Sequence, residues 1–197
     1  MTEQRLIEIL GWIWAAFGIY WLAAGFRSAK ARTYEASFHR LSRLTLLLAV
    51  FVLLFWRRGA VGFLGHRFVP YVGGLAYIGL GCAIVGMGIA AWARMHLGQF
   101  WSDKVVLKVD HQLIRTGPYA HMRHPIYSGV LLGVAGTALA LGEWRGIIAF
   151  VLLVINYSIK AKREERMLAR QFGNEFQVHQ KQTGFLLPKF ASRVYPW

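Results

Sequence analysis

The sequence predicts an all-α integral membrane protein with five transmembrane helices. Of its 197 residues, 56% are hydrophobic and 16% charged, which is too apolar for an ordinary soluble domain. The apolar residues form five uncharged runs separated by basic segments. The formal net charge is +14, but the lysines and arginines lie between the apolar runs and not on one polar face. Membrane lipids are therefore expected partners, and nucleic acid is not.

The first three runs predict a transmembrane scaffold over residues 1–93. Eighteen uncharged residues follow Glu8, enough at about 1.5 Å per residue to cross a hydrocarbon layer of about 30 Å. The second run, residues 44–56, is shorter. A full crossing there requires the flanking arginines to reach the interface, or the helix to begin nearer Phe38. The third run, residues 68–93, carries no charge and predicts the clearest helix.

Glycines recur every seven residues in the first and third of these runs. Residues seven apart lie on one side of a helix, where glycine lets the backbone of a neighbour approach closely. We therefore expect helix contacts at Gly11, Gly18 and Gly25 of the first helix and at Gly74, Gly81 and Gly88 of the third.

Residues 94–197 are predicted to form the catalytic region, within one structural domain with the scaffold. A polar loop over residues 94–124 is long enough to be functional. Helix four, residues 125–142, and helix five, with its core at 146–159, form a tight hairpin. No breaker interrupts helix five until Gly173, so it is expected to extend out of the membrane and end there.

The distribution of basic residues predicts the orientation of these helices. Segments 27–43, 94–124 and 160–197 hold 18 of the 23 lysines and arginines. The positive-inside rule therefore places these segments in the cytoplasm, with the N-terminus outside and the C-terminus inside. On this topology the loop before helix four and the charged extension of helix five face each other at the cytoplasmic side.

The stretch GPYAHMRHPIYSG, residues 117–129, joins a turn, a basic cluster and a helix start. Its initial Gly-Pro pair predicts a turn, and Pro125 suits the first turn of a helix, where a missing N–H costs nothing. Arg123 and His124 then lie beside free backbone N–H groups and the positive end of the helix dipole. Such a site is suited to an anion, either a carboxylate or a phosphate.

A pair of adjacent acidic residues, Glu164 and Glu165, stands among basic residues on the extension of helix five. Adjacent helical residues point about 100° apart, so the two carboxylates are not expected to act on one substrate atom. One is expected to face a pocket, while the other pairs with Arg163 or a neighbour. The alternative is a solvated helix with salt bridges and no chemistry.

Other kinds of site lack their motifs. His121 and His124 are spaced i, i+3, but too few ligands stand at metal-binding spacing, so no metal is predicted. The chain also lacks a P-loop, a GxGxxG fingerprint and a GxSxG elbow. The lone Cys82 can form no disulfide within the chain.

Together, these motifs resemble the isoprenylcysteine carboxyl methyltransferase family and its bacterial and archaeal relatives. The stretch GPYAHMRHPIYSG is preceded by LGQFWS at 97–102 and followed by EERMLARQFGNEF at 164–176. The resemblance covers roughly residues 94–188, with Phe176 and His179 standing where the family commonly has tyrosines. It implies S-adenosylmethionine as methyl donor and a lipophilic or prenylated acceptor from the bilayer. It also implies a prokaryotic inner-membrane location with the active site facing the cytoplasm.

The resemblance assigns the site residues. Arg123, His124 and Glu165 are the implied catalytic residues. The implied cofactor-binding residues are His111, Gln112, Leu113, Gly117, Pro118, Tyr119, Arg123, His124, Pro125, Tyr127, Ser128, Glu164 and Glu165.

Elementary chemistry agrees with these roles. Arg123 and the helix N-terminus suit the donor's carboxylate, and a glutamate suits its ammonium and ribose hydroxyls. O-methylation of a carboxylate, the preferred reaction, needs no base because the nucleophile is already ionised, so alignment and exclusion of water supply the catalysis. An amine or thiol acceptor would need a base, for which His124 or a glutamate is available.

Three alternatives stay open at this stage. The first is N-methylation of a phospholipid amine. The second is an NADPH-dependent membrane reductase of the sterol-reductase type. The third is a non-enzymatic membrane protein whose basic face binds anionic lipid. The sequence leaves the oligomeric state open.

Overall fold

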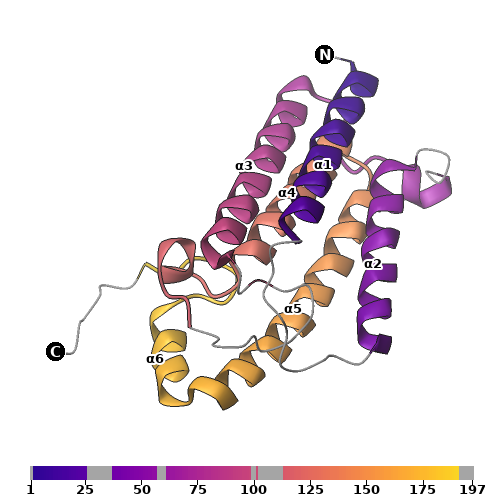
Figure 1. The fold of residues 1–197 in the computed structure, drawn as a ribbon. Helices are drawn as coiled ribbons and strands as arrows, with labels where there is room; N and C mark the ends of the chain where they lie inside the picture. The colour runs from indigo at the N-terminus through magenta and orange to yellow at the C-terminus, as the bar shows by residue number, and fades with distance from the viewer. Residues whose placement is uncertain (1, 26–36, 57–60, 99–100, 102–112, 191–197) are drawn as a thin grey trace.

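The computed structural model is helical across the part of the chain that it describes, apart from turns, connecting segments and a non-helical C-terminal segment (Figure 1). The described residues are 2–25, 37–56, 61–98, 101 and 113–190. In chain order the helices are α1 (Glu3–Gly25), α2 (Ser37–Phe55), η2 (Gly62–Gly65), α3 (Gly73–Leu97), η4 (Gly117–Ala120), α4 (Pro125–Leu141), α5 (Trp144–Phe172) and α6 (Asn174–Gln182).

Among the described helices, three are long and apolar enough to cross a membrane by length and composition. These are Glu3–Ala24 of α1, the whole of α3 and the whole of α5. The apolar part of α2, Leu41–Phe55, and α4 are shorter. Large apolar side chains such as Trp12 and Leu48 are exposed, as helix faces that meet lipid require. The structure thus supports the all-α class with membrane-spanning helices, while five crossings and their orientation stay predictions.

Helix boundaries differ from the predicted ones mainly at the polar ends. α2 begins at Ser37, well before Leu44, and α3 continues past Arg94. The apolar runs mark the part of a helix suited to hydrocarbon, but the backbone continues to hydrogen-bond internally into polar surroundings. Gly142 and Gly173, with φ of +65° and +49°, follow the last residues of α4 and α5. The predicted continuation of α5 and its stop at Gly173 are confirmed, while its exit from the membrane stays a prediction.

The backbones of α3 and α4 approach each other closely because glycines and alanines face one another. A Cβ added at Gly79 would lie 2.5 Å from the carbonyl oxygen of Gly136. A Cβ added at Gly86 would lie 2.5 Å from the carbonyl oxygen of Gly129. This is the small-residue packing typical of membrane helices.

The seven-residue glycine spacing predicted the wrong contact positions. Nothing lies within 4 Å of a Cβ added at Gly11 or Gly18 of α1, and the surroundings of Gly25 lie outside the described residues. The same open space surrounds Gly74, Gly81 and Gly88 of α3. Periodicity identifies residues that share a helix face, but long-range packing decides which face a neighbour covers.

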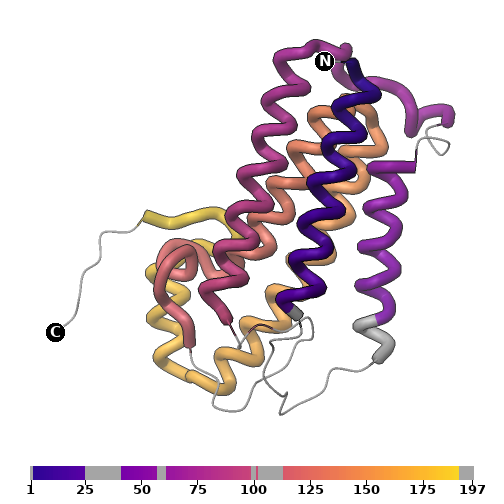
Figure 2. Tube along the Cα trace, turned by 45° about the horizontal axis from the view of Figure 1, so that its top comes forward, coloured from indigo at the N-terminus to yellow at the C-terminus, as the bar shows by residue number. Residues whose placement is uncertain are grey.

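After Gly173, α6 folds back toward α5, and residues 183–190 form a non-helical segment that we call the C-terminal strap. Figure 2 shows the strap beside the chain that precedes α4. The backbone N–H of Arg123 donates to the carbonyl of Gly184 at 2.9 Å, and the N–H of Gly184 donates to the carbonyl of His121 at 3.0 Å. The strap therefore covers the N-terminal end of α4.

Candidate functional site

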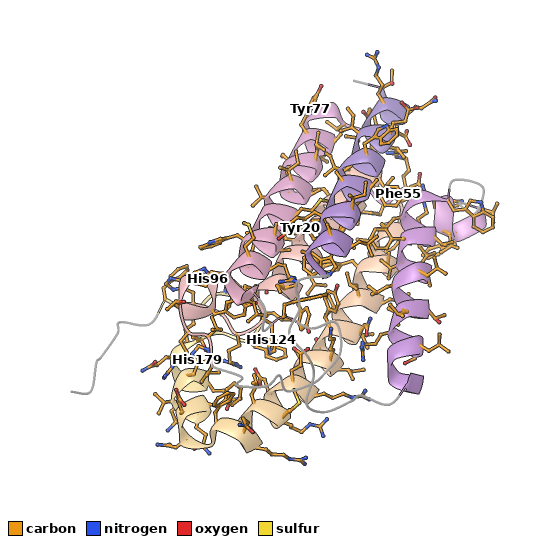
Figure 3. All side chains as sticks on the ribbon, in the orientation of Figure 1. Tyr20, Phe55, Tyr77, His96, His124 and His179 are labelled. Carbon is orange, nitrogen blue, oxygen red and sulfur yellow. The ribbon has the colours of Figure 1, made fainter. Side chains whose placement is uncertain are left out.

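The turn that precedes α4 is built around Gly117. This residue has φ of +57°, a region that favours glycine, and a Cβ there would lie 2.7 Å from the ring of His96. Nε2 of His96 lies 2.8 Å from the hydroxyl of Thr116. The Gly-Pro turn is therefore confirmed, and it rests on the C-terminal end of α3. Figure 3 places His96, His124 and His179 toward the same end of the bundle.

Arg123 links the N-terminal end of α4, called the mouth of α4 below, to α5 and to the C-terminal segment. Its Nε donates to Oε1 of Glu165 at 2.5 Å, a charge-assisted hydrogen bond. Its Nη1 donates to the carbonyl oxygens of Thr183 at 2.6 Å and Gln180 at 3.2 Å. The side chain is only 12% exposed. Arg123 thus holds together segments that lie far apart in the sequence.

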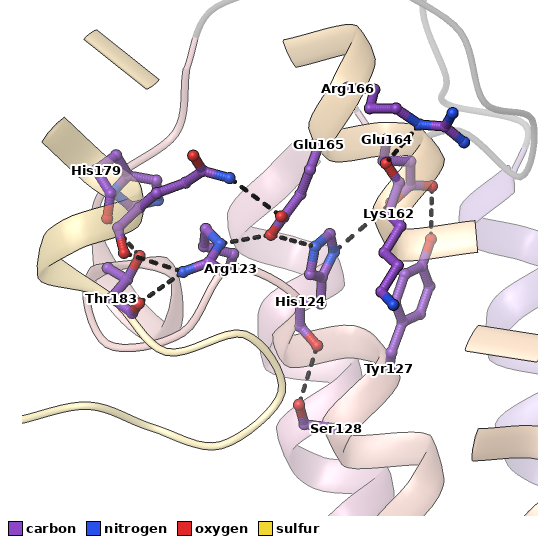
Figure 4. A network of polar contacts seen from close by, with 11 residues as sticks. Arg123, His124, Tyr127, Ser128, Lys162, Glu164, Glu165, Arg166, His179 and Thr183 are labelled. Atoms are coloured by element: carbon purple, nitrogen blue, oxygen red, sulfur yellow. Dashed lines mark hydrogen bonds and ion pairs between the residues drawn. The ribbon is translucent and has the colours of Figure 1, made fainter. Parts of the chain in front are cut away.

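His124 lies between the two adjacent glutamates of α5 (Figure 4). Its Nε2 is 3.2 Å from Oε1 of Glu165, and its Nδ1 is 3.7 Å from Oε2 of Glu164. The hydroxyl of Tyr127 donates to Oε1 of Glu164 at 2.6 Å. These carboxylates approach the N-terminal end of α4, where an anion was expected to bind.

Both glutamates face α4, whereas the sequence indicated that one would face a pocket and the other would pair with Arg163 or a neighbour. The two side chains diverge around the helix, but His124 lies between them, with a different ring nitrogen nearest each carboxylate. Gln180 adds a hydrogen bond to Oε2 of Glu165 at 3.1 Å. Glu165 and Glu164 remain partly accessible, with side chains 15% and 20% exposed.

A stack of three rings leads from this network into the bundle. The rings of His124 and Tyr127 lie 5.5 Å apart, nearly parallel at 7°, and those of Tyr127 and Tyr157 lie 4.6 Å apart at 25°. The ammonium of Lys160 lies 5.3 Å from the centroid of the Tyr127 ring and 3.9 Å from Oε1 of Glu164. Tyr127 therefore has its hydroxyl in the polar network and its ring among aromatic neighbours.

A cavity of about 340 Å³ adjoins the stack, between α1, α2, α4 and α5. Most of its lining is apolar or aromatic, including Trp14, Trp21 and Trp101. Tyr127 and Lys160 belong both to the cavity lining and to the polar network. The cavity volume lies at the lower end of the range for small-molecule sites, about 300–1,000 Å³.

Two predicted site residues form the first turn of α4. Pro125 is the first residue of the helix, as predicted from its missing N–H, and it is buried. The hydroxyl of Ser128 donates to the carbonyl oxygen of His124 at 3.1 Å and to that of Leu186 in the strap at 2.5 Å. Ser128 thus fastens the strap to α4.

The remaining predicted residues lie before α4. Pro118 and Tyr119 are buried in η4, and burial raises the pKa of the Tyr119 hydroxyl above its ordinary value. Leu113 is half-buried. His111 and Gln112 lie outside the described residues.

Several residues of the network and cavity were missed from the sequence. Lys160 stands four residues before Glu164, and this i, i+4 spacing could have identified it. Gln180 and Thr183 act on Arg123 from the C-terminal segment. Arg43 of α2 lines the cavity. No local pattern indicates these last three, because their roles depend on contacts between distant segments.

Comparison with known proteins identifies relatives of the chain. Protein-S-isoprenylcysteine O-methyltransferase of Schizosaccharomyces pombe is 30% identical over 112 residues, which are 55% of this chain and 48% of that protein. A probable protein-S-isoprenylcysteine O-methyltransferase of Oryza sativa subsp. indica is 31% identical over 117 residues, 58% of this chain and 61% of that protein. The chain thus spans about half to three fifths of the length of these relatives.

The fold has a counterpart among solved structures. The eukaryotic intramembrane Ras methyltransferase ICMT (isoprenylcysteine carboxyl methyltransferase) matches with a TM-score of 0.53 and 23% identity, over 80% of this chain and 54% of that one. At this identity the match concerns the fold. The sequence profile of the phospholipid methyltransferase family matches residues 75–175, more than half of the 197 residues, and these include Arg123, His124, Glu164 and Glu165. With isoprenylcysteine O-methyltransferases among its relatives, the chain belongs to this methyltransferase family.

Proposed function

We propose that this protein is an integral membrane methyltransferase that transfers a methyl group from S-adenosylmethionine to a lipophilic acceptor. The proposal rests on one observation: the basic mouth of α4 and the acidic pair of α5 meet at the end of an apolar cavity. A donor with a charged amino-acid end and an acceptor with a hydrocarbon chain require these two environments side by side. Family membership favours methyl transfer over the reductase alternative.

The residues of the network fit the donor. Its amino-acid end carries a carboxylate and an ammonium, which suit Arg123 and Glu164 respectively. The ring faces of Tyr127 and Tyr157 suit a sulfonium, because aromatic faces attract cations. When bound, S-adenosylmethionine supplies an activated methyl group. His111, Gln112 and Leu113 are proposed, on the resemblance, to complete this site.

The network residues are proposed to play different parts. Arg123 and His124 fix Glu165 by hydrogen bonds at 2.5 and 3.2 Å, so Glu165 is a positioning residue. Glu164 is more exposed and is joined to Tyr127, which also lines the cavity. It is therefore the better placed of the two carboxylates to bind the donor's ammonium.

O-methylation of a carboxylate is the leading reaction. The relatives are named for isoprenylcysteine, and the carboxylate of such an acceptor is ionised near neutral pH, so no base is needed. The apolar cavity would exclude water from the reacting groups. N-methylation of a phospholipid amine is the second candidate, because the family is named for phospholipid. For that reaction His124, held between two carboxylates, is available to accept a proton.

The proposed setting follows from charge and helix length. We propose five crossings with the N-terminus outside, so that the network faces the cytoplasm of a prokaryotic cell at the inner membrane. The basic segments support this orientation.

Donor binding by the purified protein tests the proposal. Saturable binding of S-adenosylmethionine is expected in detergent, weakened about tenfold by Glu164→Gln and by Arg123→Ala, in line with the loss of a charge-assisted hydrogen bond. Glu175→Gln is the matched control. Glu175 lies on the exposed face of α6, where it pairs with Arg115, and it lies outside the proposed site. Absence of donor binding, or equal affinity in all variants, would exclude the assignment.

Transfer of a labelled methyl group distinguishes the two candidate reactions. Proteoliposomes are supplied with a farnesyl thioether acid or with phosphatidylethanolamine, and the labelled product is treated with mild base. A methyl ester releases its label as methanol, whereas a methylated amine retains it. Label in a base-labile product supports O-methylation, and label in a base-stable product supports the second candidate.

A further inference from the structure

We propose that residues 61–69, which precede α3, lie in the membrane interface at the end of the bundle opposite the network, with lipid covering their outward side chains. The partner is the boundary between hydrocarbon and head groups in one leaflet. The proposal goes beyond the proposed function, because it concerns neither the donor nor the acceptor.

The outward surface at this end of the bundle is apolar. Val61 and Phe63 are exposed by 69% and 60%, Trp56 at the end of α2 by 58%, and Trp144 at the start of α5 by 37%. We call these four residues the apolar rim. The rings of Phe63 and Trp144 stack, with centroids 5.3 Å apart at 23°. Aromatic rings of this kind are enriched where membrane helices meet the interface.

The charged side chains next to the rim are turned inward. Nε of Arg145 donates to Oε2 of Glu143 at 2.5 Å, and these two side chains are only 3% and 11% exposed. Arg67, on the segment itself, is partly buried and lies 3.2 Å from Oε2 of Glu3 on α1. A turn in water usually has the opposite arrangement, with its charges outside and its rings inside. The inverted arrangement suits a segment that meets lipid.

Two of these arginines also satisfy carbonyl groups at helix ends. Nη1 of Arg145 donates to the carbonyls of Leu53 at 3.2 Å and Trp56 at 3.4 Å, at the C-terminal end of α2. Nη2 of Arg67 donates to the carbonyl of Leu141, the last residue of α4, at 2.9 Å. In water the last carbonyls of a helix can bond to solvent, but in a membrane they need protein partners.

The segment is fastened to the turn between α4 and α5 by its backbone. The N–H of Trp144 donates to the carbonyl of His66 at 3.1 Å, and the N–H of Phe68 donates to the carbonyl of Gly142 at 2.9 Å. Gly142 follows the C-terminal end of α4, whereas the network lies at the N-terminal end of that helix. The rim is therefore held in place on the bundle, far along α4 from the network.

The length of α2 explains why lipid should cover the rim. Its apolar part, Leu41–Phe55, is among the apolar helices of at most 17 residues, which reach about 26 Å, less than a hydrocarbon layer of about 30 Å. Figures 1 and 2 both show α2 ending lower in the view than the N-terminal ends of α1 and α3. A hydrocarbon layer crossed by α1 and α3 would therefore extend past the end of α2, where the rim supplies the missing apolar surface.

Spin-label accessibility in lipid nanodiscs tests the proposal. In a Cys82→Ser background a nitroxide is attached to Phe63→Cys, and its collisions with oxygen, which concentrates in hydrocarbon, are compared with those of a nickel chelate, which stays in water. Gln177→Cys, on the exposed face of α6, is the water-facing control. Val85→Cys, at an exposed position of α3, is the lipid-facing control. The ratio of oxygen to nickel collisions at Phe63→Cys is expected to exceed that at Gln177→Cys at least about fivefold.

Each pattern of collisions decides the proposal. A high oxygen and low nickel rate supports it. A nickel rate equal to that at Gln177→Cys places the rim in water and overturns it. Low rates with both reagents show that protein covers the rim, as in contact between two copies of the chain, and also overturn it. Val61→Cys repeats the measurement on the same rim if Phe63→Cys fails to unfold cooperatively on heating.

Bilayer thickness provides a second measurement. Shorter acyl chains bring the water boundary closer to the rim, so the oxygen-to-nickel ratio at Phe63→Cys is expected to fall severalfold. Val85→Cys, near the middle of α3, is expected to change less. Equal changes at both positions would contradict a location at the interface. Neither measurement uses a methyl donor, so failure of the proposed function would leave their outcome unaffected.

Discussion

At the scale of single residues, the mouth of α4 is a buried network in which opposite charges balance one another. Arg123 has a carboxylate and two carbonyl partners, and His124 has a carboxylate on each side. Burying a charge is costly unless it is paired and hydrogen-bonded. Removing one member should therefore leave the others poorly satisfied, so stability and donor binding need separate measurement.

Tyr127→Phe tests the link between the network and the cavity. The substitution removes the hydrogen bond to Glu164 at 2.6 Å but keeps the ring stack. The free energy of unfolding is therefore expected to fall by about 1–2 kcal/mol. Thermal unfolding in detergent measures it. Tyr77→Phe, at an exposed position of α3, should be neutral. Nearly additive effects of Tyr127→Phe and Glu164→Gln would show that the bond contributes little.

His179 of α6 should make stability depend on pH. Burial, aided by Arg115 and Arg123 and opposed by Glu165, lowers the pKa of His179 from 6.5 to about 4. Because the folded pKa lies below the unfolded one, the stability that this residue contributes is present above pH 6.5 and is lost as the pH falls toward 4. Between pH 7 and pH 5 the loss is about 1–2 kcal/mol.

Melting temperature against pH measures this effect. The parent protein should melt at lower temperature at pH 5 than at pH 7, and His179→Gln, which has no titrating group, should show a smaller difference. If both proteins lose the same number of degrees, other groups cause the dependence.

At the scale of elements, α3 and α4 form the rigid centre that positions the site. Their glycines bring the backbones into contact, so the mouth of α4 and the end of α3 are held in a fixed relation. The strap then fixes the mouth from the other side through its hydrogen bonds to Arg123 and Ser128. α5 supplies the glutamates from a helix that continues beyond its apolar part.

Gly86→Ala should separate α3 from α4. Its new Cβ would lie 2.5 Å from backbone atoms of Gly129 and Gly133, and such overpacking costs about 1–3 kcal/mol. Gly88→Ala is the matched control, because it lies two residues away on α3 with nothing within 4 Å of an added Cβ. Thermal unfolding should show a loss for Gly86→Ala only, and equal melting of both variants would contradict the close contact.

At the scale of the whole molecule, we expect charge and apolar length together to determine how the bundle sits in a membrane. Most basic residues lie in segments predicted to be cytoplasmic. His124 of the network lies toward the end of the bundle where α5 leads into α6 (Figure 3). The proposed donor would then come from the cytoplasm and the acceptor from the bilayer. The two substrates would meet at Tyr127.

Cysteine labelling tests this orientation. In a Cys82→Ser background, Thr2→Cys should react with a membrane-impermeant maleimide on intact cells. Gln177→Cys, on the exposed face of α6, should react only after permeabilisation. Labelling of Gln177→Cys on intact cells would reverse the proposed topology.

The sequence by itself determined the apolar helices, the turn at Gly117, the start of α4 at Pro125 and the end of α5 at Gly173. These features depend on local composition and on the backbone preferences of single residues. The sequence also identified the basic and acidic segments whose side chains meet in the network. A residue pattern records such properties without knowledge of the neighbouring helix.

Only the tertiary structure decided which glycines make contact, that Glu164 and Glu165 both face His124, and that the strap closes over α4. It also revealed the cavity that α1 and α2 share with α4 and α5. Each of these features depends on how far a helix is rotated about its axis and which distant segment packs against it. That choice is made by the sum of long-range contacts, which no local period of the chain encodes.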